Sequence, residues 1–244
     1  MPWQRPMLEL RDLGVRFGGL QALDGVSISV AAGEIVGLVG PNGAGKTTLF
    51  NVISGMVRPH RGSLHLDGVD IARMPPYARA RRRIGRTFQI PQPMHALTVS
   101  ENVAVAQRFG AGRVDRRAGA EILDLVGLAD CAARDAATEL SLTELKALEV
   151  AKALATQPRM LLLDEVLAGL EANGKRRFTQ MLSDIHLRYK LAILIIEHDI
   201  ETISTLCPRA AVLDFGRLIA DGTPDFVFSH PDVVASYTGS ATHA

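Results

Sequence analysis

The sequence is poor in cysteine, with only Cys131 and Cys207 among its 244 residues. The two lie far apart and lack the spacing of metal ligands, so the sequence favours a reduced, intracellular protein over a disulfide framework. A surplus of charge is also missing, because the formal net charge is +1. The charge balance therefore gives no global electrostatic reason to expect binding to nucleic acid or to a membrane surface.

Long hydrophobic runs are missing as well. Every apolar run is far shorter than the roughly 20 residues that a membrane-spanning helix needs, and LAILII at 191–196 is followed at once by Glu197, His198 and Asp199. The opening residues MPWQRPMLEL lack the basic segment and apolar region of a secretory signal. We therefore expect a protein that stays where it is made and meets a membrane only through a partner.

The hydrophobic content of 47% is enough to bury a substantial core. Continuous apolar runs, which are typical of buried parallel strands, occur within 34–40, 160–165 and 191–196. Shorter strand patterns occur at 8–17, 26–30, 63–68 and 84–89, and a hairpin is expected around Phe215 and Gly216. The pattern is mainly helical from about Val99 to Thr156 and again from about Gly174 to Tyr189. These patterns predict an α/β fold with a separate helical lobe.

The strongest motif is GPNGAGKTT, which fits the phosphate-binding pattern G-x-x-x-x-G-K-[ST] between a predicted strand and a predicted helix. Its glycines let backbone N–H groups curl around phosphate oxygens at a helix N-terminus. Lys46 is expected to reach the β- and γ-phosphates, and Thr47 to bind Mg²⁺. A glycine turn with an incidental lysine is the alternative. The predicted nucleotide-binding residues here are Gly40, Pro41, Asn42, Gly43, Ala44, Gly45, Lys46, Thr47 and Thr48.

Three further polar groups follow strand patterns. Asp164 and Glu165 end the run MLLLDE, so Asp164 is expected to hold the metal through water and Glu165 to orient or deprotonate the attacking water. A strand end facing solvent is the alternative. His198 can donate a hydrogen bond to the γ-phosphate, although a strand-end histidine is more often structural. Gln89 is polar enough to contact Mg²⁺ or the attacking water.

Together these residues resemble the ATP-binding subunit of an ABC transporter, from about Leu8 to Gly239. The resemblance implies ATP and Mg²⁺ as ligands and a P-loop NTPase core with an N-terminal antiparallel β subdomain and an inserted α-helical subdomain. It implies one domain over 1–244, with the core at about 1–89 and 158–244 and the helical part at about 90–157. It makes Glu165, His198 and Gln89 catalytic and Thr47, Gln89 and Asp164 metal ligands.

The resemblance also assigns roles outside the P-loop. Phe17 is expected to stack on adenine, with an ordinary core phenylalanine as the alternative. Gln89 would sense Mg²⁺ and couple the ATPase to a membrane partner. The segment AGLEANG would cross a dimer interface, with Glu171 where the family usually has Asp or Asn.

The segment ELSLTELKALEV departs from the family at an important place. Ser141 and Glu144 predict a capped helix start, and the resemblance places Ser141 in the family signature, usually LSGGQ, which approaches the γ-phosphate bound by the other subunit. Thr143 replaces a glycine and Glu144 a glutamine, while Val166 stands where a proline is frequent. We hypothesise that the chain pairs with a different ATPase subunit, giving one hydrolysing site and one slow site.

The segments RFGGLQAL, NVISGMVRPHRGSLHLDGVDI and IIEHDIETI resemble the branched-chain amino acid (Liv-type) importers. This implies an ATPase that powers import of branched-chain amino acids or of a related small amino acid, amide or organic acid. The implied partners are integral membrane permease subunits, a second, non-identical ATPase and, indirectly, a substrate-binding protein. The implied location is the cytoplasmic face of the inner membrane, with no nucleic acid bound.

The basic run ARARRRIGR at 78–86 supports a rival function, an ABC-type ATPase acting on nucleic acid or in translation. A solvated helix face is the preferred explanation, because no aromatic residues interleave with the arginines. Such ATPases usually carry two cassettes or a long coiled-coil insertion, and this chain has neither. A P-loop kinase or GTPase would need an acceptor or guanine site in place of Gln89, the signature helix and His198.

Overall fold

A computed structural model describes residues 6–238 of the chain. The ends of the predicted domain, 1–5 and 239–244 with Gly239, lie outside these residues. The chain divides into two compact units, one formed by 1–79 with 192–244 and the other by 80–191. The predicted helical part at 90–157 falls within the second unit, and its boundaries at 89/90 and 157/158 stay a prediction.

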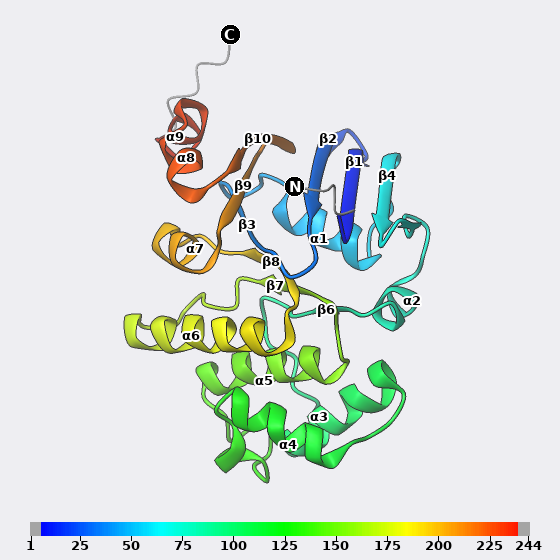
Figure 1. Ribbon diagram of the computed structural model, residues 1–244, viewed down its shortest axis with the longest axis vertical. Helices are drawn as coiled ribbons and strands as arrows, with labels where there is room; N and C mark the ends of the chain where they lie inside the picture. The colour runs from blue at the N-terminus through cyan, green and yellow to red at the C-terminus, as the bar shows by residue number, and fades with distance from the viewer. Residues whose placement is uncertain (1–5, 239–244) are drawn as a thin grey trace. The chain divides into compact units, whose positions relative to one another are not determined.

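The first unit contains a four-stranded antiparallel sheet in which β1 lies between β2 and β4 (Figure 1). Strand β1 pairs antiparallel with both neighbours, from Leu8 opposite Val30 on one side to Leu8 opposite Leu66 on the other. The sheet is the predicted N-terminal β portion. Its strands are β1 (Leu8–Phe17), β2 (Leu20–Val30), β4 (Arg61–Leu66) and β5 (Val69–Asp70).

The same unit holds the parallel strands that precede the P-loop and His198. Strand β3 (Ile35–Val39) pairs in parallel with β8 (Ala192–Ile196) and β9 (Arg209–Asp214). All residues of β3 and β8 are buried, which explains their uninterrupted apolar sequences. The remaining elements are α1 (Lys46–Ser54), α7 (Ile200–Leu206), β10 (Arg217–Gly222), α8 (Pro224–Ser229) and α9 (Pro231–Thr238), with α2 (Pro76–Arg81) at the border of the units.

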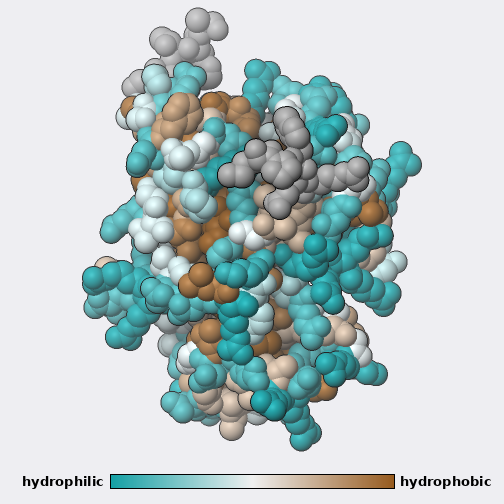
Figure 2. Space-filling view, viewed as in Figure 1, coloured by the Kyte–Doolittle hydropathy of each residue, from teal (hydrophilic) through white to brown (hydrophobic). Residues whose placement is uncertain are grey.

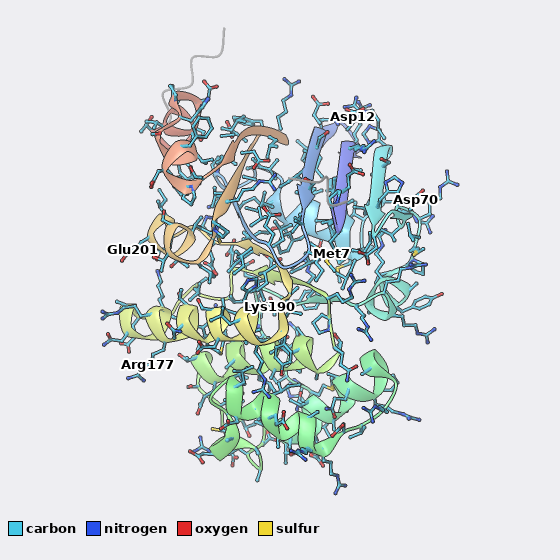
Figure 3. The ribbon with its side chains drawn as sticks, viewed as in Figure 1. Met7, Asp12, Asp70, Arg177, Lys190 and Glu201 are labelled. Atoms are coloured by element: carbon cyan, nitrogen blue, oxygen red, sulfur yellow. The ribbon has the colours of Figure 1, made fainter. Side chains whose placement is uncertain are left out.

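The second unit combines two parallel strands with a group of helices. Strand β6 (Ile84–Arg86) pairs with β7 (Met160–Asp164). Helices α3, α4 and α5 contact one another (Figure 1), and α6 ends where Lys190, labelled in Figure 3, takes a left-handed φ of 52°. The helical bounds are α3 (Val99–Ala106), a π turn (Gln107–Ala111), α4 (Arg116–Leu125), a 3₁₀ turn (Ala129–Cys131), α5 (Leu142–Ala155) and α6 (Ala172–Tyr189).

These elements confirm the predicted α/β class, the start of α1 at Lys46 and the hairpin of β9 and β10 around Phe215 and Gly216. Two strands differ from the expected lengths. Strand β2 begins at Leu20 rather than at 26, because it pairs with β1 back to Phe17, and β6 ends at Arg86 rather than at 89.

Within residues 6–238 no helix is long and apolar enough to cross a membrane. On the face drawn in Figure 2, hydrophilic side chains separate the hydrophobic atoms into patches.

Candidate functional site

The P-loop lies between β3 and α1 in the first unit and leaves the start of α1 without a side-chain cap. Gly45 is the N-cap residue, with a left-handed φ of 105°, and as a glycine it has no side-chain oxygen to cap the helix. Such N–H groups bind an anion well, because they carry the positive end of the helix dipole. The loop therefore fits the phosphates of a nucleotide.

Two glycines of the loop are required by close backbone contacts. A Cβ atom at Gly40, where φ is 143°, would lie 2.0 Å from the carbonyl oxygen of Leu213. At Gly45 it would lie 2.7 Å from the carbonyl oxygen of Ala22. A side chain at either position would push the loop away from its neighbouring strands.

Lys46 is buried and folds back over the loop. Its Nζ donates to the carbonyl oxygens of Gly40, at 2.7 Å, and Pro41, at 2.9 Å. The ammonium group is thus held at the inner side of the turn that the phosphates would enter. Thr47, the next residue, is exposed at the start of α1, where its hydroxyl is available to a metal ion.

The turn between β9 and β10 braces the P-loop from the same unit. The N–H of Gly216 donates to the carbonyl oxygen of Ala44 at 2.9 Å, and the carbonyl oxygen of Gly216 accepts from the N–H of Asp24 at 2.8 Å. Tyr237 of α9 adds a contact: burial raises the pKa of its hydroxyl, while a hydrogen bond with the backbone of Gly40 acts in the opposite direction. Sequence reasoning did not select Tyr237, since no motif marks it.

Phe17 and His198 are both exposed in the first unit. The side chain of Phe17, at the end of β1, is 50% exposed, so it is no ordinary core phenylalanine. An exposed aromatic ring provides a flat apolar surface for a base. His198 follows β8 and stands immediately before Asp199, the N-cap residue of α7.

In the second unit, Asp164 forms a buried ion pair with Arg86. Oδ2 of Asp164 lies 3.0 Å from Nη2 of Arg86, and both side chains are less than a tenth exposed. Burial lowers the pKa of Arg86, and the charge of Asp164 opposes that shift. The backbone N–H of Asp164 also donates to the hydroxyl of Thr87 at 3.2 Å. These contacts fix the carboxylate at the end of β7.

Glu165 has an unusual backbone and a defined side-chain partner. Its φ is 49°, a left-handed value that a residue other than glycine seldom adopts. The side-chain Nε2 of Gln89 donates to its Oε2 at 2.6 Å. Two residues predicted to be catalytic are therefore in contact, and backbone strain of this kind is concentrated at functional sites.

The predicted helix start at Ser141 is confirmed and forms a reciprocal cap. The N–H of Glu144 donates to Oγ of Ser141 at 3.3 Å, and Oε2 of Glu144 accepts from the N–H and the hydroxyl of Ser141 at 2.8 and 2.7 Å. Arg134 and the thiol of Cys131 contact the other oxygen of Glu144. The hydroxyl proton of Ser141 is thus directed at a carboxylate of its own chain.

The other departures from the family pattern have clear places in the fold. Thr143 is exposed in the first turn of α5. Val166 is buried immediately after Glu165. Glu171 is the N-cap residue of α6, although its side chain makes no capping hydrogen bond.

The donor set is compatible with Mg²⁺ but not with a metal cage built from protein alone. No group of three or more His, Cys, Asp or Glu residues within 6–238 could hold a metal ion. Mg²⁺ is ordinarily bound through one or two carboxylates and completes its shell with phosphates and water. The hydroxyl of Thr47, the carboxylate of Asp164 and the side-chain carbonyl of Gln89 are oxygen donors, and one of them is a carboxylate.

Comparisons with known proteins identify the sequences that this chain resembles. Residues 23–168 match the ABC transporter family. The chain is 36% identical to the high-affinity branched-chain amino acid transport ATP-binding protein BraF of Pseudomonas aeruginosa, over 97% of this chain and 99% of that protein. The corresponding protein LivG of Escherichia coli is 35% identical over the same shares. The methionine import ATP-binding protein MetN of Mesorhizobium japonicum is 38% identical over 96% of this chain but 66% of its own length.

The solved structures that the chain resembles are also components of ABC transporters. The crystal structure of the ADP conformation of an ATP-binding cassette of an ABC transporter superposes with a TM-score of 0.87 at 30% identity, covering 97% of this chain and 100% of that chain. The structure of cbiO1 from Clostridium perfringens, part of an ABC transporter complex, has a TM-score of 0.82 at 27% identity, covering 98% and 96%.

Proposed function

The chain belongs to the ABC transporter family as an ATP-binding subunit, an ATPase whose hydrolysis is coupled to transport, and from this premise we propose its cargo and partners. The cargo is a branched-chain amino acid or a related small amino acid, amide or organic acid. The observation that carries this choice is the match to BraF and LivG over 99% of their lengths. MetN has similar identity, but this chain spans about two thirds of it.

The residues divide the work of hydrolysis as follows. The loop from Gly40 to Thr48 and the ammonium of Lys46 bind the phosphates, and Phe17 stacks on adenine. Glu165 accepts a proton from the water that attacks the γ-phosphorus, while the bond to the bridging oxygen breaks to give ADP and phosphate. His198 donates a hydrogen bond to the γ-phosphate. Thr47, Gln89 and Asp164 would hold Mg²⁺. When bound, the ion would neutralise charge on the phosphate oxygens.

The partners follow from the same family. Integral membrane permease subunits bind the chain at the cytoplasmic face of the inner membrane, and a substrate-binding protein acts indirectly. ATP closes a dimer of ATPase subunits and hydrolysis reopens it, with Gln89 passing the motion to the permease. The chain contacts no part of the cargo in this arrangement.

The second ATPase subunit is not identical to this one. In the signature segment the hydroxyl of Ser141 donates its hydrogen bond to Glu144 rather than to a phosphate. Glu144 also places a negative charge beside that hydroxyl. Thr143 adds a side chain where close backbone approach to phosphate is needed. A site that uses this segment binds ATP and turns over slowly, whereas the site that uses Lys46 and Glu165 turns over normally.

The basic run does not favour the nucleic-acid alternative. Of its arginines, Arg79 is 1% exposed and Arg86 is in the ion pair with Asp164. Two of the five arginine side chains are therefore buried and do not contribute to an exposed basic surface. The remaining three, Arg81, Arg82 and Arg83, are exposed without interleaved aromatic residues.

The ATPase proposal is tested by measuring MgATP hydrolysis of the purified chain over a range of protein concentrations, with Glu165→Gln as the control for contaminating enzymes. We expect ATP binding with little turnover by the chain alone and normal turnover after addition of the second ATPase subunit and permease. Turnover that rises with the square of concentration would contradict the unequal sites, as would Thr143→Gly leaving turnover of the assembled transporter unchanged.

The cargo is tested by uptake of labelled leucine, methionine and urea into cells that lack this chain, with and without the restored chain. Restored leucine uptake, lost again with Glu165→Gln, is the expected result. Restoration of methionine uptake alone would reject the branched-chain proposal.

A further inference from the structure

Helix α5 carries two buried charged residues on one face. Lys146 and Glu149 are three positions apart in the helix, and they are 5% and 4% exposed. A charge is costly to bury unless hydrogen bonds satisfy it. The hydrogen-bond partners of these two side chains therefore identify the segments that are anchored to α5.

Lys146 holds the turn that contains Glu165. Its Nζ donates to the carbonyl oxygens of Glu165, at 3.1 Å, and Ala168, at 2.5 Å. The same carbonyl of Glu165 accepts from the N–H of Ala168 at 3.2 Å, which closes the turn. The ammonium group thus binds two carbonyls of the turn in which Glu165 has its left-handed φ of 49°.

Glu149 holds the loop that contains Gln89. Its Oε1 accepts from the backbone N–H of Gln92 at 2.8 Å and from Nζ of Lys152 at 2.6 Å. Lys152 also donates to the carbonyl oxygen of Gln92 at 2.6 Å. Both backbone polar groups of Gln92, three residues after Gln89, are therefore fixed to α5.

The two anchored segments meet in the hydrogen bond between Gln89 and Glu165, at 2.6 Å. We propose that Lys146 and Glu149 are positioning residues: by anchoring both segments to one helix, they keep Gln89 within hydrogen-bond distance of Glu165. This inference rests on the catalytic roles proposed above for those two residues. Because Ser141 is the N-cap residue of α5, a displacement of the signature segment would move both anchors together.

The test uses the full chain and measures hydrogen exchange before it measures hydrolysis. In Lys146→Met we expect the amides of residues 166–168 to exchange about tenfold faster, and in Glu149→Leu, which removes the acceptor, the amide of Gln92, while exchange elsewhere is unchanged. Lys146→Arg should keep exchange slow, because a guanidinium can still donate to two carbonyls. Arg177→Met on α6, an exposed position labelled in Figure 3, and Glu121→Leu on α4 are the matched controls.

Hydrolysis is then measured in the assembled transporter. Each of the two variants should lower kcat by about tenfold with KM for ATP changed by less than about twofold, since the nucleotide-binding loop is untouched. Uniformly faster exchange across the chain would show general destabilisation and overturn the proposal. Unchanged local exchange, or an unchanged kcat in a folded variant, would overturn it as well.

The Glu165→Gln variant separates this inference from the function on which it rests. If Glu165→Gln keeps full hydrolysis, the proposed catalytic role of Glu165 is wrong and the positioning proposal falls with it. If Glu165→Gln abolishes hydrolysis while Lys146→Met and Glu149→Leu leave exchange and kcat unchanged, only the positioning proposal is wrong.

Discussion

The side chain of Gln89 donates a hydrogen bond of 2.6 Å to the carboxylate of Glu165. A carboxylate that accepts such a hydrogen bond is held in one orientation, because the bond weakens when donor and acceptor are misaligned. Motion of the loop that carries Gln89 would therefore change the orientation of the Glu165 carboxylate. The contact links the residue proposed to face the permease to the residue proposed to activate water.

Replacement of this donor is expected to uncouple hydrolysis from transport. In Gln89→Ala, Glu165 loses the hydrogen bond from Gln89, and we expect kcat of the assembled transporter to fall by about tenfold with little change in KM for ATP. The amount of cargo transported for each ATP hydrolysed should also fall. Both are measured in vesicles that contain the complete transporter.

Gln92 offers a matched control in the same loop. Its side chain is exposed, and its contacts with Glu149 and Lys152 use backbone atoms, so Gln92→Ala should keep them. An equal loss in Gln92→Ala and Gln89→Ala would mean that the loop, rather than the contact with Glu165, is responsible.

The ion pair between Arg86 and Asp164 should be important for stability. Arg86→Met leaves the carboxylate of Asp164 buried without this partner, a change that costs about 3–5 kcal/mol in comparable buried pairs. Urea unfolding measures the loss, and exposed Arg82→Met is the control. A loss below about 1 kcal/mol, the range of surface pairs, would contradict the buried pairing.

Arg79 should stabilise the helix that follows the P-loop. Its guanidinium donates to the carbonyl oxygens of Val52 and Ile53 in the last turn of α1 and to that of Ala72. Burial lowers its pKa to about 10, so it stays charged at neutral pH and complements the negative end of the helix dipole. We expect Arg79→Met to lower the free energy of unfolding by about 2–4 kcal/mol through the orphaned carbonyls.

Circular dichroism during urea unfolding measures this effect, again with Arg82→Met as the control. The same loss in both variants would mean that the arginine run acts through its total charge. A loss limited to Arg79→Met would assign the effect to the buried hydrogen bonds.

The sequence predicted those parts of the site in which local spacing determines the chemistry. GPNGAGKTT, the run ending at Asp164 and the cap of Ser141 with Glu144 are each contained in a few consecutive residues, so their patterns are visible without a fold. Arg86 could not be selected in the same way, because its partner Asp164 is 78 residues away. Lys146 and Glu149 were hidden for a related reason, since within an apolar helix their polarity suggests exposure.

The elements that the sequence did not predict, or predicted with other bounds, are short and depend on tertiary contacts. Strand β6 has three residues and is defined by its pairing with β7. Helices α7 and α8 have seven and six residues, too few for a clear helical period.

The cap at the signature helix gives a prediction about pH. Hydrogen bonds from the hydroxyl and then the backbone N–H of Ser141 hold the pKa of Glu144 below its usual value. A carboxyl with a lowered pKa stabilises the fold above its unfolded pKa of about 4.3 and loses that effect as the pH falls through the folded value. Glutamine can still accept the hydrogen bonds of the cap, so Glu144→Gln should cost only the charge contribution at a helix N-terminus, about 0.3–1 kcal/mol of unfolding free energy at pH 7.

The difference between the natural chain and Glu144→Gln should then shrink toward zero as the pH falls below about 4, because protonated Glu144 and glutamine are both neutral. Urea unfolding of both proteins at a series of pH values measures it, with Glu121→Gln on α4 as an exposed control. A difference that stays constant from neutral to acidic pH would mean that the carboxylate charge does not stabilise the cap. The contact of Ser141 with Glu144, from which the unequal-site proposal is argued, would then have no energetic support.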